Sequence, residues 1–458
     1  MQTEKTSPTV RHRWLTLATL VFAGEAIFFL PFVLPRVFRP TLLQVFDLTN
    51  LQLGWAFSAY GVVAMLSYFP GGPLADRFGP RRLMSIALLS TSAGGVLLAT
   101  VPASQTLMML YAFWGVTTVF LFWAGLIRAT RQWGGASLQG SAFGLLDGGR
   151  GLVAALIGSL AVYGYSLLLP SDLETLSSQE QSRAFANVIW LFTGVTFAAA
   201  VSVWLVLPKD SAMDLKHDSH SATQRELGKW KHFRWDGVRM VARMPSVWLQ
   251  AMIVLCAYVA YKGLDDVSLY AKEALGFDNV AAAYSSTLSM WMRPVAAVVA
   301  GVIADRVRVS TMTAVSFVVL TIGSSVITLD LLQPGMLVGF LVVIAATSAA
   351  VFSLRGLYFA IMREGNVPFR HTGAAVGIVS AVGYTPDVFM GPLMGVLLDR
   401  GPASSGDPTR GHQYVFAIVA GFSIVGFVTT WLFRRVNKNA NAVNPIDTDC
   451  SDSVEHTV

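Results

Sequence analysis

Long apolar runs recur along the whole chain, and they constrain its fold more than any other feature. One helical crossing of a bilayer core needs about 20 apolar residues. Only 13% of the residues are charged, against about 25% in an average soluble protein, so there is too little polar surface for a soluble protein of this size. We therefore predict an all-α membrane protein with twelve transmembrane helices, over residues 14–34, 51–70, 83–101, 106–127, 140–169, 185–207, 247–270, 281–303, 311–331, 334–361, 372–398 and 414–433.

A polar stretch separates these runs into two sets of six. It is rich in Lys, Arg, His and Asp and carries few apolar residues, which is typical of a linker. We expect the chain to divide into a cytoplasmic N-terminus, a first six-helix half, a basic cytoplasmic linker, a second six-helix half and a polar, disordered cytoplasmic tail. The corresponding residues are 1–13, 14–207, 208–246, 247–435 and 436–458.

The distribution of Lys and Arg predicts the orientation. Cytoplasmic loops of membrane proteins carry an excess of these residues, and placing the N-terminus inside puts most of them there. The outer loops then receive only Arg36, Arg39, Arg183, Lys272, Arg400 and Arg410. We predict that both termini are cytoplasmic. The net charge of +6 reflects this topology; its dispersal over separate loops argues against nucleic-acid binding.

A loop motif occurs once in each half. The stretch 71–82 reads GGPLADRFGPRR and follows the second apolar run, and 301–306 reads GVIADR and follows the eighth. This Gly-x-x-Ala-Asp-Arg turn resembles the signature loop of the major facilitator superfamily. The resemblance implies a secondary transporter with two pseudo-symmetric halves and a solute site between them.

The resemblance also implies a role for the repeated loop. In the superfamily the acid of the motif is associated with the start of the eleventh helix, where a carboxylate meets exposed N–H groups and the positive end of the helix dipole. We expect a conformational latch that holds the outward-open state; the alternative is a generic turn at the membrane surface. The latch residues would be Gly72, Asp76, Arg77, Gly79, Arg81, Asp305 and Arg306.

We single out nine of the ionisable residues that fall within the predicted spans or at their ends. Such residues are costly in a bilayer and usually face a cavity where they act. Acids and bases nearly balance, which indicates paired networks in a central cavity. They are Glu25, Asp147, Arg150, Lys262, Asp265, Asp266, Arg293, Arg355 and Asp387.

Three of the acids are candidate proton carriers. Glu25 has no basic residue within one turn of its helix, and an isolated buried carboxylate can be protonated near neutrality; the alternative is a packing contact between helices. Asp387 lies among the glycines and prolines of the eleventh span, where it can pair with a base or carry a proton. Asp147 shares a helix face with Arg150.

The bases are candidate ligands for an anion. Arg293 lies near the centre of the eighth span without a local acid, and a guanidinium is suited to bidentate capture of a carboxylate, phosphate or sulfonate. Its alternative is a structural pair with Asp387 or Glu25. Arg150 is either neutralised by Asp147 or available to substrate. Lys262 either binds substrate or pairs with Asp265 and Asp266, and we add Tyr258 and Tyr384 to the candidate substrate site.

Two further phrases narrow the resemblance. Residues 141–151 and 383–392 resemble a bacterial branch of the superfamily that includes the YihN-type permeases and lies near the sugar-phosphate and nitrate porters. This implies an inner-membrane permease for a small anion, and proton symport is the natural coupling. The alternatives are a drug or metabolite exporter working as a proton antiporter, and a membrane sensor with a transporter fold.

The sequence carries no pattern that favours catalysis. We find no nucleophile–base set and no metal-ligand spacing, and the two cysteines suggest neither a disulfide nor a metal site. We therefore expect a monomer that is not an enzyme and needs no cofactor or metal, with a small solute, protons and the lipid bilayer as its partners. No cleavable signal peptide is evident.

Overall fold

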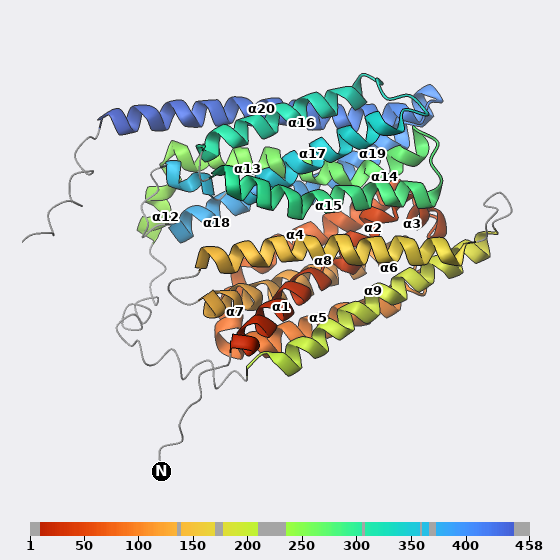
Figure 1. Ribbon diagram of the computed structural model, residues 1–458, viewed down its shortest axis with the longest axis horizontal. Helices are drawn as coiled ribbons and strands as arrows, with labels where there is room; N and C mark the ends of the chain where they lie inside the picture. Colours follow the sequence, from red (N-terminus) through yellow and green to blue (C-terminus); the bar gives the residue numbers. More distant parts are fainter. Residues whose placement is uncertain are drawn as a thin grey trace, which may run out of the picture.

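The computed structural model describes residues 10–134, 139–169, 177–208, 235–304, 307–357, 360–365 and 372–443. These residues form helices joined by short connections, and no strand occurs among them (Figure 1). The helices run roughly parallel and form two bundles that lie side by side. The predicted all-α fold is thereby confirmed.

The first bundle is built from the N-terminal part of the chain. Its first crossing is bent by 41° and continues into short helices. Its elements are α1 (Val10–Ala26), the π-helical turn η1 (Phe29–Val33), α2 (Leu34–Val37), α3 (Arg39–Val45), α4 (Asn50–Phe78), α5 (Pro80–Leu98), α6 (Ser104–Gly115), η2 (Val116–Trp123), α7 (Ala124–Gly134), α8 (Gln139–Leu168) and α9 (Ser178–Val206).

The second bundle follows a short helix that precedes its first crossing. Its seventh and eleventh crossings are both interrupted, the latter between Gly383 and Pro386. Its elements are α12 (Trp235–Ala242), α13 (Pro245–Gly263), η6 (Leu264–Asp266), α14 (Val267–Glu273), α15 (Asn279–Ala304), α16 (Val309–Thr328), α17 (Leu337–Leu357), η7 (Ala360–Gly365), α18 (Thr372–Gly383), α19 (Pro386–Ser405) and α20 (Thr409–Val443).

Helix length and apolarity agree with the twelve predicted runs. Within the described residues, eight helices are long and apolar enough to cross a membrane, and nine if the bent first crossing is included. The remaining three runs correspond to α4, α5 and α15, which are 29, 19 and 26 residues long. Large apolar side chains on the outer faces are exposed, for example Leu205 and Val338, as expected where lipid is the solvent.

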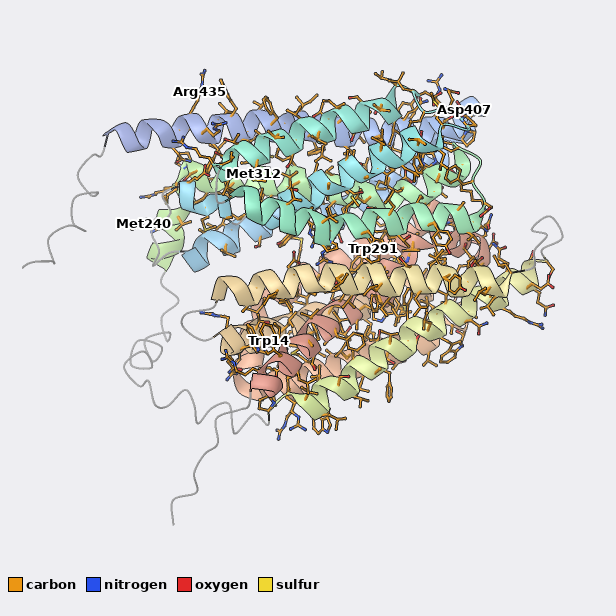
Figure 2. All side chains as sticks on the ribbon, in the orientation of Figure 1. Trp14, Met240, Trp291, Met312, Asp407 and Arg435 are labelled. Carbon is orange, nitrogen blue, oxygen red and sulfur yellow. The ribbon has the colours of Figure 1, made fainter. Side chains whose placement is uncertain are left out.

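The two bundles meet along two pairs of helices, α4 with α19 and α8 with α15. Glycines allow the first pair to approach closely: a Cβ atom on Gly395 would lie 2.5 Å from Leu51 Cα and 2.7 Å from the carbonyl oxygen of Asn50. Gly391 and Gly395 are four residues apart, the spacing that brings membrane helices into backbone contact. Trp291 lies where the bundles meet, and its indole N–H donates to Ser159 Oγ at 3.0 Å (Figure 2).

Hydrogen bonds join the bundles at the end of the molecule away from both chain termini, which we call the opposite end (Figure 1). The carboxylate of Asp399 on α19 accepts from the backbone N–H groups of Asn50 and Leu51 at 3.0 and 2.9 Å, and so caps the start of α4. Asn279 Nδ2 donates to Gln44 Oε1 at 3.1 Å. This end is therefore closed.

Candidate functional site

A cavity of about 140 Å³ lies between the two bundles. Both halves contribute charged and aromatic side chains to its wall, including every intramembrane base predicted from the sequence. The lining residues that carry the argument below are Glu25, Arg36, Arg150, Lys262, Arg293, Arg355 and Asp387 for charge, and Phe28, Phe32, Trp123, Tyr258, Tyr261 and Tyr384 for aromatic surface.

The first charged network joins α1, α8 and α15. Glu25 Oε2 accepts from Arg150 Nε at 3.1 Å and lies 3.3 Å from Arg293 Nη1. Arg293 Nη2 also donates to Asp147 Oδ1 at 2.8 Å. Arg293 from the second half therefore bridges two carboxylates of the first half, and all four side chains except that of Asp147 are nearly buried.

The second network joins α2, α13, η6 and α19. Arg36 Nε donates to Asp265 Oδ1 at 2.6 Å, which links the two halves. Lys262 Nζ lies 3.2 Å from Asp265 and 3.7 Å from Asp387. Asp387 also accepts from the Tyr258 hydroxyl at 2.9 Å. Asp387, a candidate proton carrier, and Lys262, a candidate anion ligand, thus belong to one continuous set of contacts although they lie on different helices.

Aromatic rings surround the cations of both networks. The Arg150 guanidinium lies 5.4 Å from the Phe28 ring centre and 5.7 Å from that of Trp123, and Lys262 Nζ lies 5.2 Å from Phe32. Tyr261 lies beneath two guanidinium groups, those of Arg36 at 4.5 Å and Arg355 at 4.1 Å. Such cation–π contacts favour charged bases at these positions.

The cavity carries an excess of positive charge among the described residues. Five bases line it, namely Arg36, Arg150, Lys262, Arg293 and Arg355. Four carboxylates belong to its networks: Glu25 and Asp387 on the wall, and Asp147 and Asp265 in direct contact with the bases. With every group ionised, the sum is one positive charge, and an anion entering the cavity would compensate it.

Several expectations about pairing need correction. Glu25 is not an isolated carboxylate, because Arg150 and Arg293 reach it from α8 and α15. Arg293 contacts Glu25 and Asp147, and its alternative pair with Asp387 does not form. Lys262 contacts Asp265 as predicted; the second predicted partner, Asp266, turns instead to His412 on α20. The spacing of charged residues along one helix therefore did not predict the ion pairs that form between different helices.

Sequence reasoning missed several residues of the site, of which Arg36 and Tyr261 matter most to its charge and cation–π contacts. Arg36 was assigned to an outer loop, yet it is 7% exposed and lines the cavity. The chain remains helical after the π-helical turn at 29–33, so the crossing continues past the predicted end at Leu34. Tyr261 was not among the predicted site residues, yet it also lines the cavity. An arginine two residues beyond an apolar run was the available signal.

The latch residues fall only partly within the described structure. Asp305 and Arg306 lie outside the described residues, as do the surroundings of Gly72 and the side chains of Asp76 and Arg77. Gly79 makes the turn between α4 and α5 with φ of 72°, a conformation that favours glycine. The Arg81 guanidinium lies 4.5 Å from the ring centre of Trp204 on α9.

Two helical halves that enclose a charged cavity within a lipid-facing surface define a multi-pass membrane transporter. Residues 15–354 match the sequence profile of the Major Facilitator Superfamily. The chain belongs to this superfamily, whose members are transporters and not enzymes. The predicted family is thereby confirmed.

Relatives cover nearly the whole chain. The chain is 25% identical to "Inner membrane protein YqcE" of Escherichia coli (strain K12) over 93% of its length and 95% of that protein. It is 26% identical to "Inner membrane protein YihN" of the same organism, over 93% and 97%. It is 26% identical to "Probable anion transporter 6, chloroplastic" of Arabidopsis thaliana, over 76% and 68%.

Solved structures support the fold. The "D-xylose-proton symporter" is 13% identical and superimposes with a TM-score of 0.68, covering 92% of this chain and 97% of that one. A bacterial homologue of the lysosomal transporter Spinster, in an inward-facing and unoccupied conformation, is 14% identical with a TM-score of 0.68, over 94% and 99%. At this identity the likeness concerns the fold alone.

Proposed function

We propose that this protein carries a small organic anion across the bacterial inner membrane by alternating access, coupled to protons. The observation that carries the proposal is the charge of the cavity, where five bases face four carboxylates. Membrane-buried charge is costly unless it is compensated, so an anionic solute is the substrate class that best fits this wall.

Arg150 and Arg293 are the central anion ligands in this proposal. They come from different halves, and Glu25 lies between them at 3.1 and 3.3 Å. A substrate carboxylate, phosphate or sulfonate that contacts both guanidinium groups would therefore bind both halves at once. Lys262, Tyr258 and Tyr384 provide the second wall, on the side of α13 and α19.

We assign the coupling proton first to Asp387. Glu25 contacts two guanidinium groups and Asp147 contacts Arg293 at 2.8 Å, so their negative charges are well compensated. Asp387 lies farther from its base, since Lys262 Nζ is 3.7 Å away. Protonating the least compensated carboxylate costs the least and raises the positive charge that attracts the anion.

The closed opposite end fits one state of the alternating cycle. If both termini are cytoplasmic, as the distribution of Lys and Arg predicts, this conformation is closed to the outside. The names of YqcE and YihN support the inner membrane as the location, and the name of the Arabidopsis relative supports an anionic solute. The loop around Asp76 would then hold the other state.

The test is anion binding by purified protein with Arg293→Lys as the perturbation and Arg435→Lys as the control. A lysine at 293 keeps the charge but not the bidentate fork, so anion affinity should fall by about 10- to 100-fold. Arg435 lies on the outer side of α20 (Figure 2) and is not among the residues that line the cavity, so its replacement should leave affinity unchanged. Unchanged affinity in Arg293→Lys would refute Arg293 as an anion ligand.

Coupling has a separate test. In proteoliposomes, Asp387→Asn should abolish uptake driven by a pH gradient while exchange of substrate across the membrane continues. Surviving pH-driven uptake would remove Asp387 from the mechanism. An exporter of cationic solutes would use Glu25 to bind the cation and would keep the arginines for structure. We rank it below the permease because Glu25 is engaged by two arginines; binding of cations without binding of anions would reverse this order.

A further inference from the structure

A second cluster of ionisable side chains lies outside the cavity, on the second half. His412 of α20 is in contact with two carboxylates through its two ring nitrogens. Nδ1 lies 2.7 Å from Asp266 Oδ2, and Nε2 lies 3.1 Å from Glu273 Oε2. The side chains of His412 and Asp266 are fully buried, whereas one third of the Glu273 side chain is exposed. None of the three lines the cavity.

The hydrogen bonds of this cluster require an extra proton. A neutral imidazole has one N–H donor and one lone pair, so it can donate to only one of two ionised carboxylates. Its second nitrogen would then face a carboxylate oxygen with no proton between them. Both contacts are satisfied only if the imidazole is doubly protonated or one carboxyl group carries the proton.

The surroundings of the cluster favour holding that proton. Asp266 Oδ1 is buried without a hydrogen-bond partner among the described residues, so the local negative charge is incompletely compensated. The Tyr270 ring packs edge-on against the imidazole at 5.4 Å. Among the described residues, the charged groups that also act on the cluster or on Tyr270 are Lys272 on α14 and Asp330, which follows α16.

The cluster also fixes the segment that closes the opposite end. Asp266 is the last residue of the turn η6, and the preceding residue, Asp265, forms the ion pair with Arg36 of the first half. On α14, Ser268 donates to the backbone carbonyl of Arg36 at 2.9 Å. Asp265 and Asp266 are adjacent in the chain. Through them the His412 cluster is connected directly to the contact between the halves.

We propose that His412, Asp266 and Glu273 form a proton-binding site that keeps the opposite end of the transporter closed. While the proton is bound, both contacts of His412 hold η6 and α14 in the position that presents Asp265 to Arg36. When the proton leaves to water through the exposed carboxylate of Glu273, one contact becomes repulsive and this segment is released. The proposal depends on alternating access in the proposed function, but not on the substrate class or on Asp387.

The experiment measures closure directly and without substrate. Spin labels are attached to cysteines at the exposed positions Arg183 on α9 and Arg400 on α19, with Cys450 replaced by Ser and the buried Cys256 kept. Distances between the labels are recorded from pH 5 to pH 9. The open population at this end should rise by about 10- to 100-fold with pH, the effect of losing one charged hydrogen bond.

Glu273→Gln is the decisive variant because, with a glutamine at this position, His412 can make both of its contacts without the extra proton. A neutral His412 can donate through Nδ1 to Asp266 and accept through Nε2 from the amide of a glutamine, so this variant should stay closed at every pH. His412→Gln can satisfy only one contact and should be more open throughout. Glu180→Gln, the same substitution in the helix cap of α9 at Ser177, is the matched control and should behave as the unmodified protein.

Two results would overturn the proposal. One is a distance distribution of the unmodified protein that does not change with pH. The other is a Glu273→Gln variant that keeps the full pH response. Since neither measurement involves a solute, both are independent of whether the cavity binds anions.

Discussion

Gly395→Ala should shift this protein away from the closed conformation, because Gly395 lies at the tightest approach of α19 to α4. A Cβ atom there would meet three backbone atoms: Leu51 Cα at 2.5 Å, and the Asn50 oxygen and Leu51 nitrogen at 2.7 Å. Ordinary contacts of a Cβ atom lie at 3.4 to 4 Å. Backbone atoms of a helix cannot move aside as a side chain can, so the two helices must separate by about 1 Å at this point.

The size of the effect follows from the contacts that this separation disturbs. Overpacking of a tight interface costs about 1–3 kcal/mol, and here the cost falls only on the closed conformation. The same displacement loosens the hydrogen bonds of 3.0 and 2.9 Å from the start of α4 to Asp399, one turn away from Gly395. A penalty of this size changes the ratio of open to closed molecules by about 5- to 150-fold.

The assay is the distance between spin labels at positions 183 and 400, measured at one pH. Gly377→Ala is the control, since Gly377 belongs to the same crossing but a Cβ atom there would meet nothing within 4 Å. Both variants gain the same helix propensity, up to about 1 kcal/mol. Any difference between their distance distributions therefore reports the contact between α4 and α19. If Gly395→Ala gives the same distance distribution as Gly377→Ala, close contact between α4 and α19 does not hold this end closed.

Further predictions concern three other sites. Glu25→Gln should destabilise the protein by about 3–5 kcal/mol, because it leaves buried guanidinium charge unpaired; the double variant Glu25→Gln/Arg150→Gln should recover most of this in thermal unfolding, since Arg293 keeps Asp147. Asp76→Asn should shift the label distances toward the closed opposite end, the reverse of Gly395→Ala, and no shift would leave the loop a passive turn. Asp407 accepts hydrogen bonds from the backbone and hydroxyl of Thr409, which lower the pKa of its carboxyl group. The cap that Asp407 provides is therefore present above the ordinary value of about 4 and is lost only as the pH falls through the lowered pKa, so Asp407→Ala should speed hydrogen exchange at the start of α20 equally from pH 5 to pH 9.

The fold was predictable because a bilayer imposes one requirement on every crossing. Each span must be long, apolar and helical to satisfy its own backbone, and that requirement is visible in local composition. The ends of the crossings were less predictable. The first span was predicted to end at Leu34 with Arg36 in an outer loop, but the chain continues as helix through a π-helical turn to Val37.

The candidate site was predictable in its members and not in its pairs. An ionisable residue within an apolar run is easy to recognise in the sequence. Of the nine ionisable residues that we singled out in the predicted spans, six line the cavity. Which acid meets which base depends on how helices far apart in the chain pack. Asp265 and Asp266 illustrate the difficulty: adjacent in sequence, they turn to opposite sides, one to Arg36 at the contact between the halves and one to His412 within the second half.

The start of α4 suggests why the two halves would have two discrete arrangements. Here the carboxylate of Asp399, near the end of the eleventh crossing, caps the second crossing at its first N–H groups, a favourable position for negative charge. The latch expected at the other end has the reverse assignment, with Asp76 at the end of the second crossing and the N–H groups at the start of the eleventh. A rocking motion that brings one carboxylate to its helix start takes the other away from its own. We therefore expect the two caps to compete, so that intermediate positions lose both, and Asp399→Ala and Asp76→Asn should shift the populations in opposite directions.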